Sequence, residues 1–175
     1  KLETIEYWAF NGTSLRIIRM PSVRTIGRGA FAGCSALSDV ECGEELETLQ
    51  EIAFMNCPKL ERIVLPLKGG MIEGDVFDDC WKLKKVDLVG VGGTHNTIAS
   101  LHLESWRSEM NIIFNRINQV LPTIPGERKT PEIQQWMESV VHRLDHYKGE
   151  HKAIIKEAAT LLELALWKTN LGGGE

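Results

Sequence analysis

The chain of 175 residues is 43% hydrophobic and 25% charged, which is ordinary for a globular protein that buries a core. Its net charge of −4 argues against a basic face that could follow phosphates, so no nucleic-acid partner is expected. The most apolar stretch, residues 161–167, is interrupted by Glu163 and is far shorter than the roughly 20 residues of a membrane span, so none is expected.

Residues of the same type recur every 23 positions in the first half of the chain. An earlier, shorter copy places Phe10, Leu15, Ile18 and Met20 in the same pattern, and its Cys position is missing. Because one repeat is too small to bury its own apolar side chains, the copies are expected to stack into a continuous core with parallel strands. The recurring columns are Ile26, Leu49 and Ile72; Phe31, Phe54 and Phe77; Cys34, Cys57 and Cys80; Leu37, Leu60 and Leu83; and Val40, Ile63 and Val86.

The repeat pattern Ile-x-x-x-Ala-Phe-x-x-Cys-x-x-Leu-x-x-Val resembles the BspA-type (Treponema-type) leucine-rich repeat over about residues 2–90. The resemblance extends to such proteins of microbial eukaryotes such as algae, in which a helical region like residues 95–171 often follows the repeats. It implies a curved solenoid that is used for recognition, with strands on its concave face. It implies neither a shared catalytic site nor a fixed ligand.

The four cysteines are interpreted as reduced, buried thiols, because three of them occupy one repeat column. A disulfide between neighbouring repeats is a second possibility. A metal cluster is a third, although no Cys-x-x-Cys pair is present to support it.

After Gly93 the apolar spacing changes to a heptad, which predicts helices over residues 97–121 and 131–169. Thr130 is the expected N-cap of the second helix, with Pro131 at its first position, and the heptad continues through Gly149. The predicted fold class is therefore α+β, with a leucine-rich-repeat solenoid over residues 1–94 and an antiparallel helical hairpin over residues 95–171. Residues 172–175 are expected to form a flexible tail.

The end of the second predicted helix, residues 158–167, is apolar on more than one face and extends past the shorter first helix. A helix with this pattern must be covered. It could cap the open end of the solenoid, which we favour together with a monomer, or it could join two copies of the chain as a homodimer. The residues concerned are Leu161, Leu162, Leu164, Leu166 and Trp167.

No catalytic constellation is present, so the protein is not expected to be an enzyme or to hold a cofactor. His142 and His146 have the i, i+4 spacing of a metal site, but both lie on the outer side of the heptad and lack the Glu of a zinc hydrolase. They are interpreted as surface histidines, and no metal site is assigned. The chain starts at Lys1 with neither a signal peptide nor an initiating Met, which is interpreted as the edge of a fragment.

The predicted function is that of a non-catalytic module whose concave face binds a protein partner. The outward strand positions also allow a simpler interpretation as cross-strand ion pairs, such as Arg19–Glu41 and Asp39–Arg62. The alternative function is a structural or oligomerisation element assembled through coiled C-terminal helices. The candidate partner-binding residues are Ile17, Arg19, Asp39, Glu41, Arg62, Val64, Lys85 and Asp87.

Overall fold

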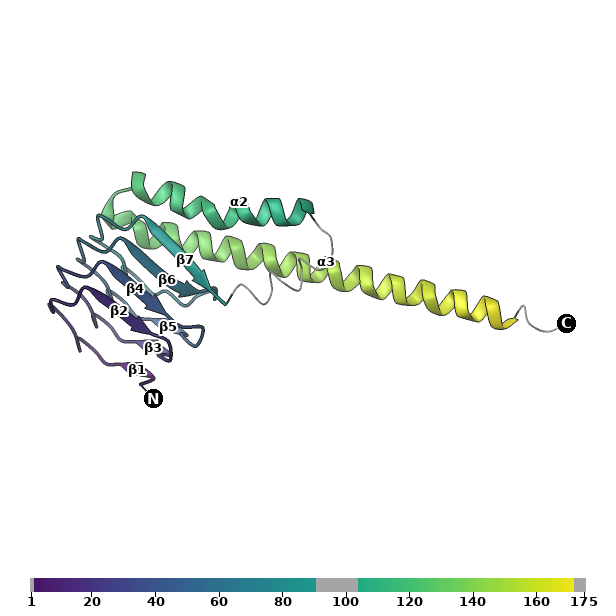
Figure 1. Cartoon of the computed structure of the whole chain (residues 1–175), viewed down its shortest axis with the longest axis horizontal. Helices are drawn as coiled ribbons and strands as arrows, with labels where there is room; N and C mark the ends of the chain where they lie inside the picture. The colour runs from purple at the N-terminus through teal and green to yellow at the C-terminus, as the bar shows by residue number, and fades with distance from the viewer. Residues whose placement is uncertain (1, 91–103, 172–175) are drawn as a thin grey trace. The chain divides into compact units, whose positions relative to one another are not determined.

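The repeats form the coils of a solenoid in the computed structural model, which describes residues 2–90 and 104–171 (Figure 1). Each strand pairs in parallel with the equivalent strand of the next coil, which confirms the predicted architecture. One sheet has the order β1 (Thr4–Ile5), β3 (Thr25–Ile26) and β5 (Thr48–Leu49). The other has the order β2 (Ile17–Met20), β4 (Asp39–Cys42), β6 (Arg62–Pro66) and β7 (Lys85–Val89).

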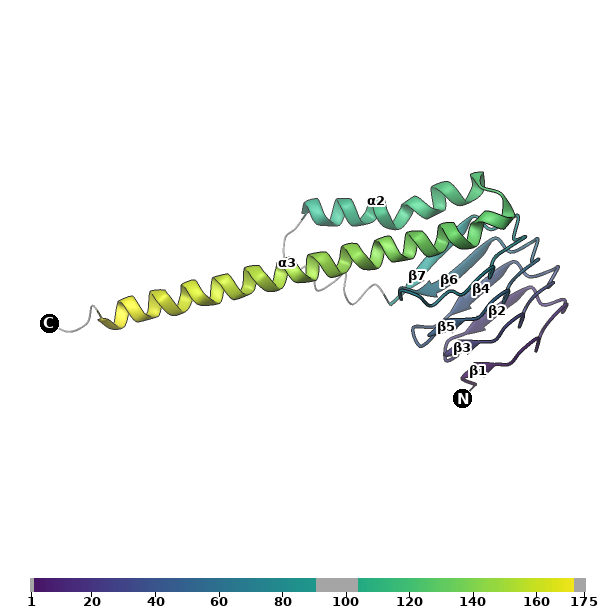
Figure 2. The ribbon, with the colours of Figure 1, turned by 180° about the vertical axis from the view of Figure 1, so that it is seen from behind.

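The repeat columns form the core because the strand register brings equivalent residues side by side. Ile18 pairs with Val40, and Val40 in turn with Ile63. The phenylalanine rings stack along the solenoid axis, with centroid separations of 5.2, 5.3 and 6.0 Å from Phe10 to Phe77 and interplanar angles of 4° to 6°. Such a continuous stack makes the stability of each coil depend on its neighbours. Figure 2 shows the succession of coils from behind.

The cysteine column is buried, and its members are free thiols. Each sulfur donates to the carbonyl oxygen of the Phe in the preceding coil, at 3.1 Å for Cys34, 3.2 Å for Cys57 and 3.1 Å for Cys80. In the first coil Thr13 takes the Cys position, three residues after the Phe, and its hydroxyl lies 3.4 Å from the sulfur of Cys34. Thr13 therefore fills the Cys position that the first repeat was expected to lack. The one residue by which this repeat is shorter than the others is missing after Thr13.

The helical region consists of α2 (Glu104–Val120), two short 3-10 helices, η1 (Leu121–Thr123) and η2 (Gly126–Arg128), and α3 (Lys129–Leu171). The predicted start of the first helix at residue 97 lies outside the described residues. The second helix matches its prediction within two residues at each end, and Gly149 does not interrupt it.

The chain divides into two compact units, Lys1–Val140 and Val141–Glu175. In the first unit, α2 runs antiparallel to the beginning of α3, as expected for a hairpin (Figure 1). A buried Trp136 holds the two helices together by donating its indole N–H to the carbonyl of Ile113 at 2.8 Å. The heptad pattern did not point to this residue.

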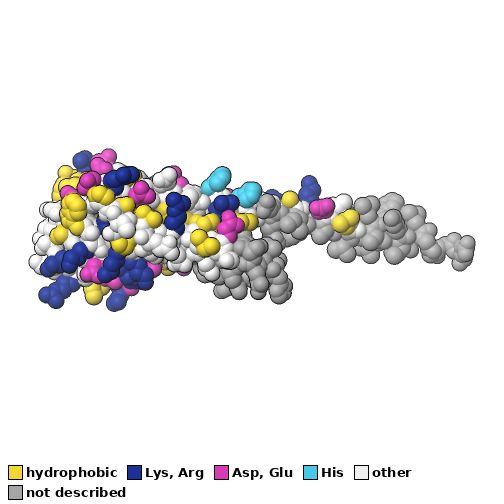
Figure 3. Space-filling view, turned by 90° about the horizontal axis from the view of Figure 1, so that it is seen from above, with side chains coloured by type: hydrophobic (Ala, Val, Ile, Leu, Met, Phe, Trp, Pro, Cys, Tyr) yellow, Lys and Arg dark blue, Asp and Glu magenta, His cyan; other side chains and the backbone are white. Residues whose placement is uncertain are grey.

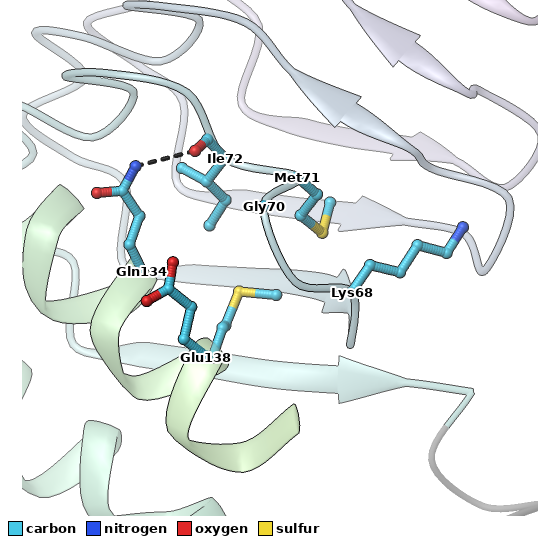
Figure 4. Close-up of a pocket in the computed structure, with 7 residues that line it drawn as sticks. Lys68, Gly70, Met71, Ile72, Gln134 and Glu138 are labelled. Atoms are coloured by element: carbon cyan, nitrogen blue, oxygen red, sulfur yellow. Dashed lines mark hydrogen bonds between the residues drawn. The ribbon is translucent and has the colours of Figure 1, made fainter. Parts of the chain in front are cut away.

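The last coil is closed by polar side chains of the helical region. Asn118 pairs with Val86 of β7 as a neighbouring strand would: its amide oxygen accepts the Val86 N–H at 2.8 Å, and its amide nitrogen donates to the Val86 carbonyl at 3.2 Å. Gln134 donates to the carbonyl of Ile72 at 2.9 Å (Figure 4). These contacts satisfy backbone groups that an uncovered sheet edge would expose.

Two further side chains complete this closure. The hydroxyl of Thr130 accepts the backbone N–H of Phe77 at 2.8 Å, so it serves the last coil, and α3 already begins at Lys129. The predicted N-cap role of Thr130 is therefore wrong. Lys129 is buried and donates to the carbonyl oxygens of Trp81 and Leu83. Burial lowers the pKa of its ammonium group. The four residues Asn118, Lys129, Thr130 and Gln134 are called the end cap below.

The four end-cap residues all precede residue 158 and belong to the first unit, so the cap expected at residues 158–167 is not tested by these contacts. Leu161 exposes 61% of its surface. Leu162, Leu164, Leu166 and Trp167 lie outside the residues whose side chains the structure describes, so their contribution stays a prediction. Within the described parts of the chain, none of the helices combines the length and hydropathy that crossing a membrane requires.

Candidate functional site

The eight candidate binding residues lie on the sheet formed by β2, β4, β6 and β7, two on each strand. Parallel pairing in register arranges them in two rows, because equivalent residues of successive coils are Cα partners. We call this surface the strand face. Its first row is Ile17, Asp39, Arg62 and Lys85, and its second is Arg19, Glu41, Val64 and Asp87.

Arg62 lies at the centre of the ion pairs on the strand face. Its guanidinium contacts Asp39 at 3.1 Å, Glu41 at 3.2 Å and Asp87 at 2.7 Å, the last through Nε. Arg19 pairs with Glu41 at 2.8 Å, as the cross-strand interpretation predicted, and the Arg62–Asp39 pair was predicted too. The diagonal contacts to Glu41 and Asp87 were missed, since they depend on how a long side chain turns between neighbouring rows.

The charges of the strand face stabilise one another. The hydrogen bonds from Arg19 and Arg62 lower the pKa of Glu41. The hydrogen bond to Asp87, together with those to Glu41 and Asp39, raises the pKa of Arg62. Because the face carries three acids and three bases, its charge sums to zero. It is therefore polar and ordered without presenting a field of one sign.

Exposure differs between the centre and the margin of the strand face. The side chain of Arg62 is 30% exposed, whereas that of Arg19 is 69% exposed. Ile17 is a large exposed hydrophobic residue at the β2 margin, and Val64 is half-buried at the centre. Apolar side chains thus lie beside charged groups that ion pairs already hold in place.

Two pockets lie outside the strand face, and the larger, of about 130 Å³, is lined by Arg116, Trp136 and Ser139 among others. A pocket of about 20 Å³ beside the Gln134–Ile72 contact is lined by Lys68, Met71 and Met137, among others, and has room for about one water molecule. Figure 4 shows its lining side chains. The described residues contain no group of three or more His, Cys, Asp or Glu side chains that could hold a metal ion.

The histidine pair lies in the second unit of the chain. His142 and His146 are both exposed on α3, and histidine side chains are visible at the surface in Figure 3. Acidic and basic side chains are interspersed on the face that this view presents. Neither the histidines nor the charges form a concentrated site there.

Comparison with known proteins identifies the repeats. The model of the BspA type leucine rich repeat region, six copies, matches residues 1–115. No curated protein matches the chain. A crystal structure of a leucine rich cell surface protein from Faecalibacterium prausnitzii A2-165 matches with 26% sequence identity and a TM-score of 0.37. The match covers 53% of this chain and spans 31% of the length of that chain.

Proposed function

Because the chain belongs to the BspA-type leucine-rich repeat family, we propose that it is a non-catalytic scaffold whose strand face binds a protein partner. The repeats build a rigid stack, and the strand face is the part of it where eight side chains are aligned by backbone register. Function in such a fold belongs to the surface that the coils hold in place.

The observation that carries the proposal is the contact of Arg62 with three carboxylates, from Asp39, Glu41 and Asp87. Ordering a flexible charged side chain at an interface costs about 0.5–1.5 kcal/mol, and here that ordering precedes binding. The half-buried residues would then give the surface its shape, while the exposed Ile17, Arg19 and Lys85 make the new contacts.

The balance of charge favours a protein over a polyanion as the partner. Phosphate backbones are bound by several uncompensated Lys or Arg side chains. Of the three bases on the strand face, Arg19, Arg62 and Lys85, each contacts a carboxylate. A partner with its own mixture of apolar and polar groups matches this surface better.

Site-specific photo-crosslinking tests the proposal. We would place a photoreactive residue at Val64 on the strand face and, as a matched control, at the exposed Ile112 of α2. We expect a protein that crosslinks from Val64 and not from Ile112. Once purified, that protein should bind the chain, and Lys85→Glu should weaken its binding by about tenfold or more, which corresponds to about 1.4 kcal/mol.

Equal crosslinking from both positions, or binding that Lys85→Glu leaves unchanged, would contradict the assignment of the strand face. Melting curves recorded for each variant distinguish a lost contact from a lost fold. Because Lys85 contributes only an exposed pair with Asp87, its substitution should leave the fold intact.

Self-association through the C-terminal part of α3 is a second candidate function. It is supported by the exposure of Leu161 on a helix that contains several further apolar residues. Sedimentation equilibrium of the wild type and of Leu161→Asp tests it. A dimer that this substitution converts to monomer supports self-association, and a monomeric wild type excludes it.

A further inference from the structure

A pocket lies between α2 and α3 within the first unit, where the two helices run side by side (Figure 1). Its volume is about 130 Å³. One water molecule needs about 10–15 Å³, and a cavity of about 150 Å³ can hold benzene, so this pocket has room for a small organic molecule. We call it the helix pocket, and it is lined by Arg116, Ile117 and Val120 of α2 and by Glu132, Gln135, Trp136 and Ser139 of α3.

The apolar part of the helix pocket is already ordered. Ile117 is 2% exposed and Trp136 is 6% exposed, so both side chains are held by their neighbours. The indole N–H of Trp136 donates to the carbonyl of Ile113 at 2.8 Å, which fixes the ring and uses its one polar group. A ligand therefore meets an apolar surface that needs no ordering when it binds.

Arg116 brings a positive charge to the helix pocket that the described residues leave unpaired. Its side chain is exposed on α2, and no carboxylate in the described parts of the chain forms an ion pair with it. Arg19 and Arg62 differ in this respect, because carboxylates of the strand face already hold them. The guanidinium of Arg116 thus keeps its planar set of N–H donors, which matches the two oxygens of one carboxylate.

Glu132 brings the opposite charge to the same pocket from the facing helix. Its carboxylate lies 3.7 Å from the guanidinium of Arg128, which is too long for a hydrogen bond. Glu132 and Arg116 both line the helix pocket, yet no ion pair joins these two described residues. The carboxylate of Glu132 therefore keeps the capacity to accept hydrogen bonds from a cation.

This pair of charges selects the chemistry of a ligand. Glu132 disfavours a simple anion, and Arg116 disfavours a simple cation. A molecule that carries both a carboxylate and an ammonium group can pair with both residues. The apolar surface of Ile117 and Trp136 favours an apolar group on the same molecule.

We propose that the helix pocket binds a free α-amino acid with a small apolar side chain. The carboxylate of the ligand pairs with Arg116, its ammonium group pairs with Glu132, and its side chain lies against Trp136. A ligand bound in this way joins α2 to α3, the helices that carry Asn118 and Gln134 of the end cap, so it should stabilise the first unit. The site is separate from the strand face and does not depend on the partner proposed there.

Titration of the full chain with L-valine tests the proposal. The indole N–H signal of Trp136 in a two-dimensional NMR spectrum reports on the pocket, and its absence in Trp136→Phe assigns it. We expect this signal to shift saturably and the melting temperature to rise with the concentration of valine. N-acetylvaline, which lacks the ammonium group, and valine amide, which lacks the carboxylate, should each bind about tenfold more weakly or worse.

Variants of the chain test the two charged residues. Arg116→Gln and Glu132→Gln should each weaken the binding of valine by about tenfold or more. Arg16→Gln and Glu138→Gln are the matched controls, since both alter exposed residues outside the helix pocket, and they should leave binding unchanged.

Circular dichroism establishes whether each variant is folded, and two variants on different helices keep the test valid if one of them is not. Absence of a saturable shift, equal binding of either valine analogue, or equal weakening by the control substitutions would overturn the proposal.

Discussion

The backbone N–H of Phe77 donates to the hydroxyl oxygen of Thr130 at 2.8 Å, across 53 residues of sequence. In every earlier coil the equivalent N–H donates to a backbone carbonyl of the next coil. The hydroxyl oxygen of Thr130 thus takes the place of the backbone carbonyl that a further coil would supply. Its own proton goes to Asp78 at 3.1 Å, so the hydroxyl both accepts and donates.

Thr130→Val should destabilise the first unit by about 1–3 kcal/mol, because the substitution keeps the shape of the side chain and leaves the buried Phe77 N–H without a partner. Urea denaturation measures the change in the free energy of unfolding. The matched control is Thr160→Val, which removes an exposed hydroxyl bonded within α3 and should change little. Equal effects of the two substitutions would argue against a capping role for Thr130.

Phe54→Ala should cost about 3–5 kcal/mol, because Phe54 is fully buried between two other rings of the stack. Phe10→Ala should cost clearly less, since that ring has one neighbour in the stack and is partly exposed. Thermal melting of both variants checks this order. A larger loss for Phe10→Ala would mean that the stack is not the main source of cooperativity.

The stability of the strand face should depend on pH through Glu41. Its pKa in the folded chain lies below the ordinary value of 4.5 because Arg19 and Arg62 hold the charged form. The resulting stabilisation is fully present above the unfolded value and is lost as the pH falls through the folded pKa. Arg62→Gln should therefore destabilise the protein more at about pH 7 than at about pH 3.

The measurement is the free energy of unfolding of wild type and Arg62→Gln at both pH values. Arg16→Gln is the control, since Arg16 makes no ion pair within the described residues. A difference between wild type and Arg62→Gln that does not change with pH would show that Arg62 acts through packing of its stem rather than through its carboxylate partners.

Truncation after residue 157 should leave the melting temperature of the solenoid unchanged, because the end cap consists of Asn118, Lys129, Thr130 and Gln134. Differential scanning calorimetry of the truncated and full chains makes the comparison. A drop of several degrees would instead support the original expectation that residues 158–167 protect the solenoid.

The strand face could be predicted from sequence because it depends on periodicity alone. A fixed step along the chain sets the register, and the register places Ile17 beside Asp39 and Arg19 beside Glu41 without further information. The stack of rings follows in the same way, since one Phe column determines all of its contacts.

The end cap could not be predicted in this way, because it joins a repeating segment to one that does not repeat. Thr130 precedes Pro131, and this pair of residues is also typical of a helix N-terminus. The local sequence therefore predicted that Thr130 caps its own helix, whereas its hydroxyl accepts the N–H of Phe77. The side-chain amide of Asn118 pairs with both backbone groups of Val86, as a neighbouring strand would. The spacing of apolar residues along α2 does not indicate such a contact.

The cysteine column places one buried thiol in each of three consecutive coils, at Cys34, Cys57 and Cys80. Burial raises the pKa of Cys34, so this thiol stays protonated and unreactive while its coil is closed. A thiol-specific reagent would therefore modify each cysteine only when its own coil opens. The rates at these positions, resolved by mass spectrometry, would report how opening proceeds along the solenoid, using a reporter that the natural sequence already contains.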